Sequence, residues 1–200
     1  MVLRKTREES QITRDRIISA SYEVIRSKGY EQMTRDDIAR KVGMTRGAVN
    51  WHFASKEEIY LAVLNKILDD FQRERAAYYG DSQASPQEKI AHLISMPLKM
   101  QDQYRFINDI PRYMLSDERF AEIVERMAQN RKFFIEYVTG CLTEIENEEG
   151  RKYRNKTEIA HLIYFLHEGL HSNYAETAFE DPDIIRDNYK TYLKMLLEIH

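Results

Sequence analysis

The sequence contains few of the residues that interrupt or cross-link a chain. Among its 200 residues are one cysteine, Cys141, seven glycines and four prolines. A single cysteine excludes an internal disulfide and fits a reducing compartment. We expect Cys141 to be a small buried apolar residue rather than a reactive thiol.

Long apolar runs are also missing. No stretch approaches the roughly 18 consecutive apolar residues of a membrane-spanning helix. The first ten residues, MVLRKTREES, lack the apolar core of a signal peptide. We therefore expect a cytoplasmic protein with no membrane partner.

Basic residues are slightly fewer than acidic residues, and they are unevenly distributed along the chain. The formal net charge is -3; residues 1–60 carry 12 Lys and Arg against 9 Asp and Glu, whereas the remainder carries 18 against 24. A basic N-terminal segment on an acidic body suits an electrostatic approach to a polyanion through one end. A surplus of this size is also found on ordinary solvated surfaces.

The spacing of apolar residues predicts an all-α fold of about nine helices. Apolar residues recur at intervals of three and four, and no segment alternates with a period of two. Capping-box patterns occur at Thr34/Asp37, Ser55/Glu58 and Ser85/Glu88. Helices are predicted at about residues 12–28, 46–52, 117–146 and 157–178, with others that begin after Thr34, Ser55, Ser85 and Asp181.

Two short helices joined by the sequence VGMT predict a helix-turn-helix at about residues 33–52. A plain helical hairpin would have the same pattern. In a helix-turn-helix, the N-terminal end of the second helix reaches base edges in the DNA major groove. Arg46 can bond a guanine bidentately and Asn50 an adenine. The base-reading set is Thr45, Arg46, Gly47, Ala48 and Asn50, in which the small residues 47 and 48 allow close approach.

Helix N-termini also predict phosphate contacts. Thr34 and Lys56 lie where backbone N–H groups, a hydroxyl and an ammonium suit phosphate oxygens. Arg35, adjacent to Thr34, is assigned to the same DNA-binding set.

The stretch TRDDIARKVGMTRGAVNWHFASKEEIYLAVL resembles the DNA-binding domain of the tetracycline-repressor (TetR) family. RKTREESQITRDRIISAS likewise resembles the start of the multidrug-efflux regulators of that family. The resemblance covers about residues 4–70. It implies a DNA-binding domain at residues 10–70 and an effector-binding and dimerisation domain at residues 71–200.

The function implied by this resemblance is that of a transcriptional regulator rather than an enzyme. It would be a repressor that binds a palindromic DNA operator as a homodimer through its last two helices. A small hydrophobic or aromatic effector would release it, and no cofactor or metal is expected.

The resemblance also implies roles for the triplet Trp51, His52 and Phe53. Trp51 and His52, like Lys56, would approach the phosphate backbone, and Phe53 would be core. Successive helical residues are about 100° apart, so the three cannot all point inward. Family members usually have a tyrosine where this chain has Asn50, so a different base preference is expected.

A rival motif lies near the C-terminus. Residues 167–171, HEGLH, match the H-E-x-x-H pattern of zinc metallopeptidases. Catalytic zinc requires a third ligand, and His161, Glu176 and Glu180 leave that ligand unsettled. The resemblance instead favours packing across a dimer interface, where Gly169 permits close approach. A third alternative, a helical scaffold that binds only protein, predicts no salt-sensitive binding to a duplex.

The segment between Pro86 and Tyr113 is rich in methionine and aromatic residues. Such stripes are more often core than pocket, but Pro97 and Pro111 should interrupt the helices here, and broken helices leave cavities. The candidate effector-binding residues are Met96, Met100, Tyr104, Phe106, Ile110, Tyr113, Phe134, Tyr137, Tyr164 and His167.

Overall fold

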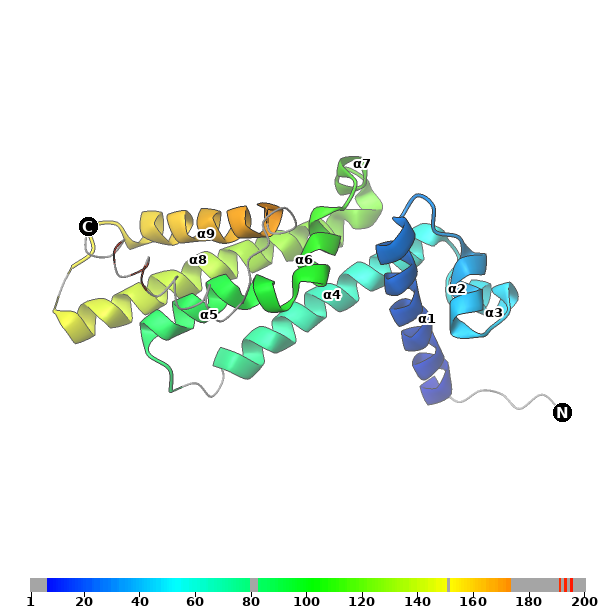
Figure 1. The fold of residues 1–200 in the computed structure, drawn as a ribbon, viewed down its shortest axis with the longest axis horizontal. Helices are drawn as coiled ribbons and strands as arrows, with labels where there is room; N and C mark the ends of the chain where they lie inside the picture. Colours follow the sequence, from blue (N-terminus) through cyan, green and yellow to red (C-terminus); the bar gives the residue numbers. More distant parts are fainter. Residues whose placement is uncertain are drawn as a thin grey trace. The chain divides into compact units, whose positions relative to one another are not determined.

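The computed structural model describes residues 7–79, 83–150 and 152–173, together with residues 191, 193 and 195, and the side chains of all but residues 78 and 170–173 of these. The described residues form nine α-helices and one short 3-10 helix and contain no strand (Figure 1). The predicted all-α fold is confirmed. None of the helices in these ranges is both long and apolar enough to cross a bilayer.

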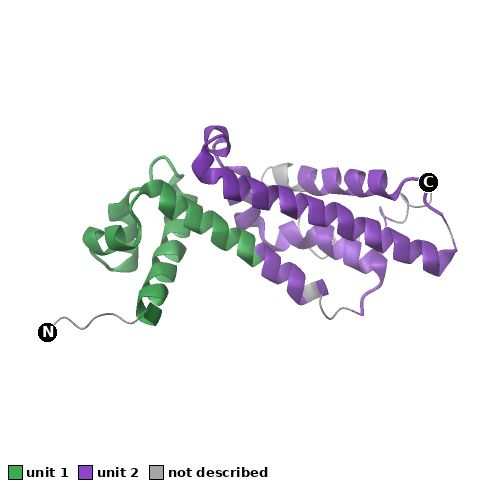
Figure 2. Cartoon of the chain, turned by 180° about the vertical axis from the view of Figure 1, so that it is seen from behind, with its two compact units in different colours: residues 1–70 green, residues 71–200 purple. Residues whose placement is uncertain are grey.

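The chain divides into two compact units, Met1–Asp70 and Phe71–His200 (Figure 2). The first unit contains α1 (Arg7–Lys28), α2 (Arg35–Val42), α3 (Arg46–His52) and most of α4 (Lys56–Tyr79). The second contains the end of α4, α5 (Pro86–Lys99), α6 (Gln101–Asn108), α7 (Arg112–Leu115), η1 (Glu118–Phe120), α8 (Ala121–Glu149) and α9 (Lys156–Asn173).

The core of the first unit draws one apolar residue or more from each of its helices. Ile17 of α1, Ile38 of α2, Val49 of α3 and Ile59 of α4 are completely buried, as is Phe53 between α3 and α4. These residues follow the helical spacing of the sequence, so each short helix is fixed by one apolar face.

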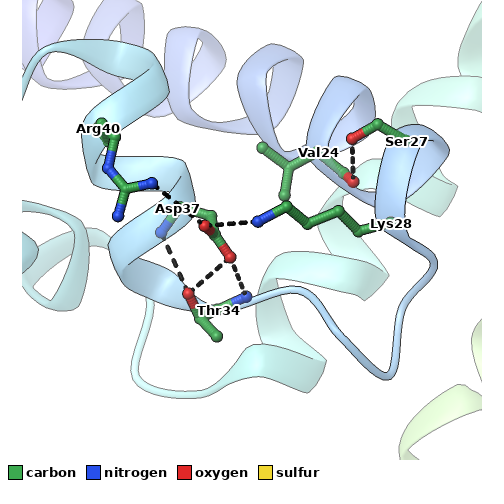
Figure 3. A network of polar contacts seen from close by, with 6 residues as sticks. All are labelled: Val24, Ser27, Lys28, Thr34, Asp37 and Arg40. Carbon is green, nitrogen blue, oxygen red and sulfur yellow. Dashed lines mark hydrogen bonds and ion pairs between the residues drawn. The ribbon is translucent and has the colours of Figure 1, made fainter.

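The ends of α2 and α3 are set by local hydrogen bonds. Thr34 Oγ1 accepts from the Asp37 backbone N–H at 3.1 Å, and Asp37 Oδ2 accepts from the Thr34 N–H at 3.2 Å (Figure 3). Gly43 ends α2 with φ 72°, a left-handed conformation that glycine adopts without strain. Thr45 Oγ1 accepts from the Ala48 N–H at 3.2 Å and caps α3. The capping box predicted at Thr34 and Asp37 is confirmed.

Asp37 carries an acid-sensitive part of the stability of the first unit. Hydrogen bonds from Lys28 and Thr34 lower the pKa of Asp37 from 3.8 to about 2 (Figure 3). Since the folded pKa lies below the unfolded one, the ionised carboxylate stabilises the fold above pH 3.8, and this contribution is lost as the pH falls toward 2. Asp37→Asn should lower the melting temperature near neutral pH, with a difference from wild type that shrinks over that acid range.

Thermal unfolding as a function of pH measures this difference. Asp36→Asn is the matched control, because Asp36 is an exposed carboxylate that pairs with Arg46 rather than capping α2. A penalty for Asp37→Asn that stays constant down to the acid limit would contradict the role of the charge.

Two other predicted capping boxes differ in outcome. At α5 both reciprocal bonds between Ser85 and Glu88 are present, and Pro86 is the first helical residue. At α4 the Ser55 hydroxyl accepts from the Glu58 N–H at 3.0 Å, but the Glu58 carboxylate accepts from the N–H of Ala54. The Glu58 carboxylate therefore binds the connection before α4, and the second hydrogen bond of a capping box, from the Ser55 N–H, is not formed.

The second unit is built around α5, α8 and α9, which pack side by side (Figure 1). Pro97 lies inside α5 without ending it at once, because the helix continues to Lys99 before α6 begins. Pro111 precedes α7 as its cap residue. Cys141 is buried in the core as predicted, and burial raises the pKa of its thiol to about 11. The core residues are Ile90, Leu93, Ile94, Phe134, Val138, Cys141, Leu142, Ile145, Tyr153, Ile159, Ala160, Ile163 and Leu193.

Several helix boundaries differ from the predicted ones. The first helix starts at Arg7 rather than near residue 12, because Glu8 and Glu9 supply the acidic first turn that helix N-termini favour. The helix predicted at residues 117–146 begins at Ala121 after a 3-10 turn and extends to Glu149. The end of the helix predicted at 157–178 and most of the one predicted after Asp181 lie outside the described residues.

Candidate nucleic-acid interface

One side of α3 is anchored and the other is open to solvent. Val49 is fully buried, and the Phe53 N–H donates to Val49 O at 3.0 Å where the helix ends. Ala48 is half-buried, whereas Thr45, Arg46, Gly47 and Asn50 are exposed. Most of the predicted base-reading residues therefore lie on the solvent side of α3, whose opposite side is anchored in the core by Val49.

The adjacent residues Trp51, His52 and Phe53 divide between solvent and core. Phe53 has no exposed surface, whereas Trp51 is 71% exposed and His52 is half-buried. The Trp51 and His52 rings meet edge to face, with centroids 4.6 Å apart. The predicted burial of Phe53 is confirmed, and Trp51 presents most of its large aromatic surface to solvent.

Arg46, the predicted guanine-reading residue, is paired within the unit. Its Nη1 lies 3.3 Å from Asp36 Oδ2, and both side chains are more than half exposed. Because exposed ion pairs contribute little free energy, Arg46 can exchange the carboxylate for an external acceptor. Asp36 was absent from the sequence-based set, since its position beside Arg46 depends on how α2 and α3 cross.

Three other predicted DNA-binding residues use their polar groups inside the unit. The Thr34 hydroxyl donates to Asp37 Oδ2 at 2.7 Å. Arg35 Nη1 donates to Ala54 O at 3.0 Å, and Lys56 Nζ donates to Glu31 O at 2.9 Å. The Lys56 ammonium also lies 4.4 Å from the Tyr30 ring centroid. These contacts stabilise the connection before α2 and the connection between α3 and α4.

Arg14 is a supporting residue that the local sequence did not reveal. Its Nη1 donates to His52 O at 2.8 Å, and its guanidinium lies 4.0 Å from the Phe53 ring centroid. A cation here interacts favourably with the C-terminal end of the α3 dipole. Arg14 is 38 residues away in sequence from His52, so only the folded unit shows the contact.

Gly47 has room for a side chain. A Cβ at this position would meet Thr45 Oγ1 at 3.8 Å, an ordinary contact. Nothing in the packing of the described residues therefore requires glycine here.

The part of the HEGLH motif that the structure describes packs within the helical core. His167 is buried, and burial lowers its pKa to about 4. Glu168 is half-buried and is hydrogen-bonded to Tyr164; burial raises the pKa of this carboxyl. The His171 side chain and residues 176 and 180 lie outside the described residues. Within the described ranges, no group of three His, Cys, Asp or Glu side chains could hold a metal ion.

Four of the predicted effector-binding residues form a ring cluster. The His167 ring centroid lies 4.7 Å from Phe134, 6.0 Å from Tyr104 and 6.2 Å from Tyr164. The cluster joins α6, α8 and α9. The other predicted residues are dispersed: Met96, Phe106 and Ile110 are buried, Met100 and Tyr137 are half-buried, and Tyr113 is 62% exposed.

The four helices of the first unit, with an anchored second short helix and an exposed polar face, define a helix-turn-helix module of the DNA-binding class. Residues 17–63 match the family model described as "Bacterial regulatory proteins, tetR family". The N-terminal unit therefore belongs to the TetR family, whose members are transcriptional regulators.

Two curated relatives from Pseudomonas putida resemble this unit. The HTH-type transcriptional regulator SrpR is 54% identical over 61 residues, which are 30% of this chain and 29% of that protein. The HTH-type transcriptional regulator TtgR is 31% identical over 112 residues, 54% of this chain and 53% of that protein. The matches thus span at most about half the length of these relatives.

Solved structures extend the likeness in fold to nearly the whole chain. A putative transcriptional regulator from Saccharomonospora viridis, solved in complex with choline, has a TM-score of 0.76 over 92% of this chain and 96% of that one, at 16% identity. A TetR transcription regulator from Haloarcula marismortui has a TM-score of 0.72, with 94% and 98% coverage at 14% identity. At such identity the likeness concerns the fold alone.

Proposed function

We propose that this chain is a sequence-specific transcriptional repressor that binds a palindromic operator as a homodimer and leaves it when a small effector binds. The open face of α3 carries this proposal: Arg46 and Asn50 present base-reading groups, and Trp51 presents an aromatic surface, on a helix anchored by Val49 and Phe53. Residues 10–70 are the proposed DNA-binding domain, and residues 71–200 are the proposed effector-binding and dimerisation domain.

An apolar face on α9 supports the dimer. Leu162, Phe165 and Leu166 are 48%, 66% and 52% exposed, and their spacing puts them on one side of the helix. Soluble monomers rarely expose such contiguous apolar surface. A Cβ at Gly169 would meet none of the described residues within 4 Å, which leaves space for a second helix. In the proposed dimer, α9 and the helix predicted after Asp181 in each copy pack against those of the other.

Selection of bound duplexes from random DNA tests the proposal. We expect enrichment of an inverted repeat whose half-site centres are about one helical turn apart, roughly 34 to 36 Å, because two-fold symmetry sets the spacing of the two α3 helices. If no sequence is enriched and binding to duplexes is insensitive to salt, the proposal is wrong and a scaffold that binds only protein is favoured.

Lys56→Ala should weaken binding to all duplexes alike. Lys56 lies at the start of α4 with its ammonium on Glu31 O and the Tyr30 ring, so it can turn to a phosphate only by leaving those contacts. Loss of one phosphate contact should reduce the slope of log K against log salt by about 1. Fluorescence anisotropy over a range of salt concentrations measures the slope.

Lys66→Ala is the matched control, because Lys66 lies on the same helix and pairs with Asp70 at 3.0 Å. Its salt slope should equal that of the wild type. A Lys56→Ala protein that is less stable but keeps the wild-type slope would show that Lys56 only holds the α1–α2 connection.

A further inference from the structure

Helices α4 and α8 form the walls of a partly open cavity of about 430 Å³ in the second unit. Ligand sites commonly have volumes of about 300 to 1,000 Å³. Residues 72, 75, 76 and 79 of α4 and residues 126, 129, 130 and 133 of α8 line it. Each set follows the i, i+3, i+4, i+7 spacing of one helix face, so two facing stripes form the walls. None of the ten effector-binding residues predicted from the sequence is among them.

Arg75 is the polar centre of this cavity. It is half-buried; its Nη2 donates to Asn130 Oδ1 at 2.9 Å, and its guanidinium carbon lies 4.8 Å from the Phe133 ring centroid. Burial lowers the pKa of Arg75, but a guanidinium remains charged in proteins. In the part of the chain that the structure describes, no carboxylate forms an ion pair with Arg75.

The Arg75 guanidinium is half-buried, and its contacts, the Asn130 amide and the Phe133 ring, carry no charge. Such a site favours the binding of an anion. Water is partly excluded, so charge-assisted hydrogen bonds are stronger here than at the surface. Asn130 accepts one of the five guanidinium N–H bonds and presents its own N–H₂ group as a further donor. Arg126 adds positive charge to the α8 wall.

The rest of the cavity is aromatic. Tyr79 and Phe133 both line it. Tyr137 lies behind them, stacked on Phe133 with centroids 5.6 Å apart and 4.3 Å from Tyr79. Phe133 is 36% exposed, so a flat apolar body can lie against its ring.

We propose that the cavity between α4 and α8 binds a small aromatic carboxylic acid, with the carboxylate on the guanidinium of Arg75 beside Asn130 and the ring against Phe133 and Tyr79. An arginine fork fits a carboxylate with two parallel N–H···O bonds. The inference rests on the proposed function, because it gives the effector its chemical class and its site.

Isothermal titration of the full-length protein with 1-naphthoate and with 1-naphthamide tests this site without DNA. The two probes share an aromatic body and differ in charge. The wild type should bind naphthoate, and naphthamide much more weakly. Arg75→Gln should weaken naphthoate binding about 10- to 100-fold and leave the naphthamide affinity nearly unchanged, since hydrogen bonds to charged groups contribute about 1.5 to 3 kcal/mol.

Two further variants test whether Arg75→Gln loses binding only because the protein is less well folded. Arg73→Gln makes the same change two residues away at an exposed position of α4 and should bind naphthoate like the wild type. Arg75→Lys keeps the charge without the fork and should be intermediate. The proposal is overturned if 1-naphthoate fails to bind at millimolar concentration, if naphthamide binds equally well, or if Arg75→Gln matches the wild type.

Operator binding is measured separately on the same proteins. A protein that binds its operator but no aromatic acid refutes this inference and leaves the proposed function standing. A protein that binds naphthoate through Arg75 but no duplex keeps the site and refutes the proposed function.

Discussion

Phe53→Ala is expected to lower the free energy of unfolding of the first unit by about 3 to 5 kcal/mol, the range for removing a fully buried phenylalanine. Phe53 has no exposed surface, ends α3 through its N–H bond to Val49 O, and lies under the Arg14 guanidinium. Its loss leaves a cavity where α3 meets α4. The substitution should therefore weaken both the core packing and the attachment of α3 to that core.

Urea unfolding followed by the fluorescence of Trp51 measures this loss, because Trp51 is the only tryptophan and lies in the first unit. Ile12→Ala is the control: Ile12 is 55% exposed on α1, and such surface changes usually alter stability by less than about 0.5 kcal/mol. Equal transitions for Phe53→Ala and Ile12→Ala would mean that Phe53 does not anchor α3.

Arg46→Ala is expected to reduce the affinity for the selected operator by about 1 to 3 kcal/mol, or roughly 5- to 150-fold, and to relax the preference at one base position. Arg46 is exposed at the start of α3, where a fork of donors can reach guanine O6 and N7. Anisotropy titrations with the operator and with single-base variants measure both effects. Arg26→Ala, an exposed arginine in the last turn of α1, should leave both unchanged.

Asp36 makes this prediction more specific. In the free protein its carboxylate holds Arg46 at 3.3 Å, so binding a base must first break that pair. Asp36→Ala should raise affinity by at most about fivefold, as expected for an exposed ion pair. In the double variant the gain should vanish, because Asp36 acts through Arg46. An equal gain in the Arg46→Ala background would instead indicate general repulsion between Asp36 and the DNA phosphates.

The N-terminal unit was predictable because its determinants are local in sequence. Thr34, Asp37, Gly43 and Thr45 each act within a few residues of the helix end that they define, so their spacing alone predicts α2 and α3. Apolar residues at helical spacing likewise predict α1, although not its first residue. The Glu58 carboxylate departs from its predicted bond by one residue, since either N–H before α4 lies within its reach.

Contacts between helices could not be predicted in the same way. The pairing of Arg46 with Asp36, the Arg14 bond to His52 O and the use of Lys56 on Glu31 O join residues 10 to 38 positions apart. The second unit shows the same limit. Which residues line the cavity between α4 and α8 likewise depends on packing, because Arg75 and Asn130 are 55 positions apart in sequence.

Most of the helices, the capping boxes of α2 and α5, the burial of Phe53 and the family of the N-terminal unit could be predicted from the sequence alone. Periodicity and capping depend on neighbours within about one helical turn, which the sequence displays directly. Which charged groups meet could be seen only in the folded chain, because ion pairs and cavities depend on how separate helices cross. Thus Arg46 lies against Asp36, and Arg75 lies half-buried against Asn130 and Phe133.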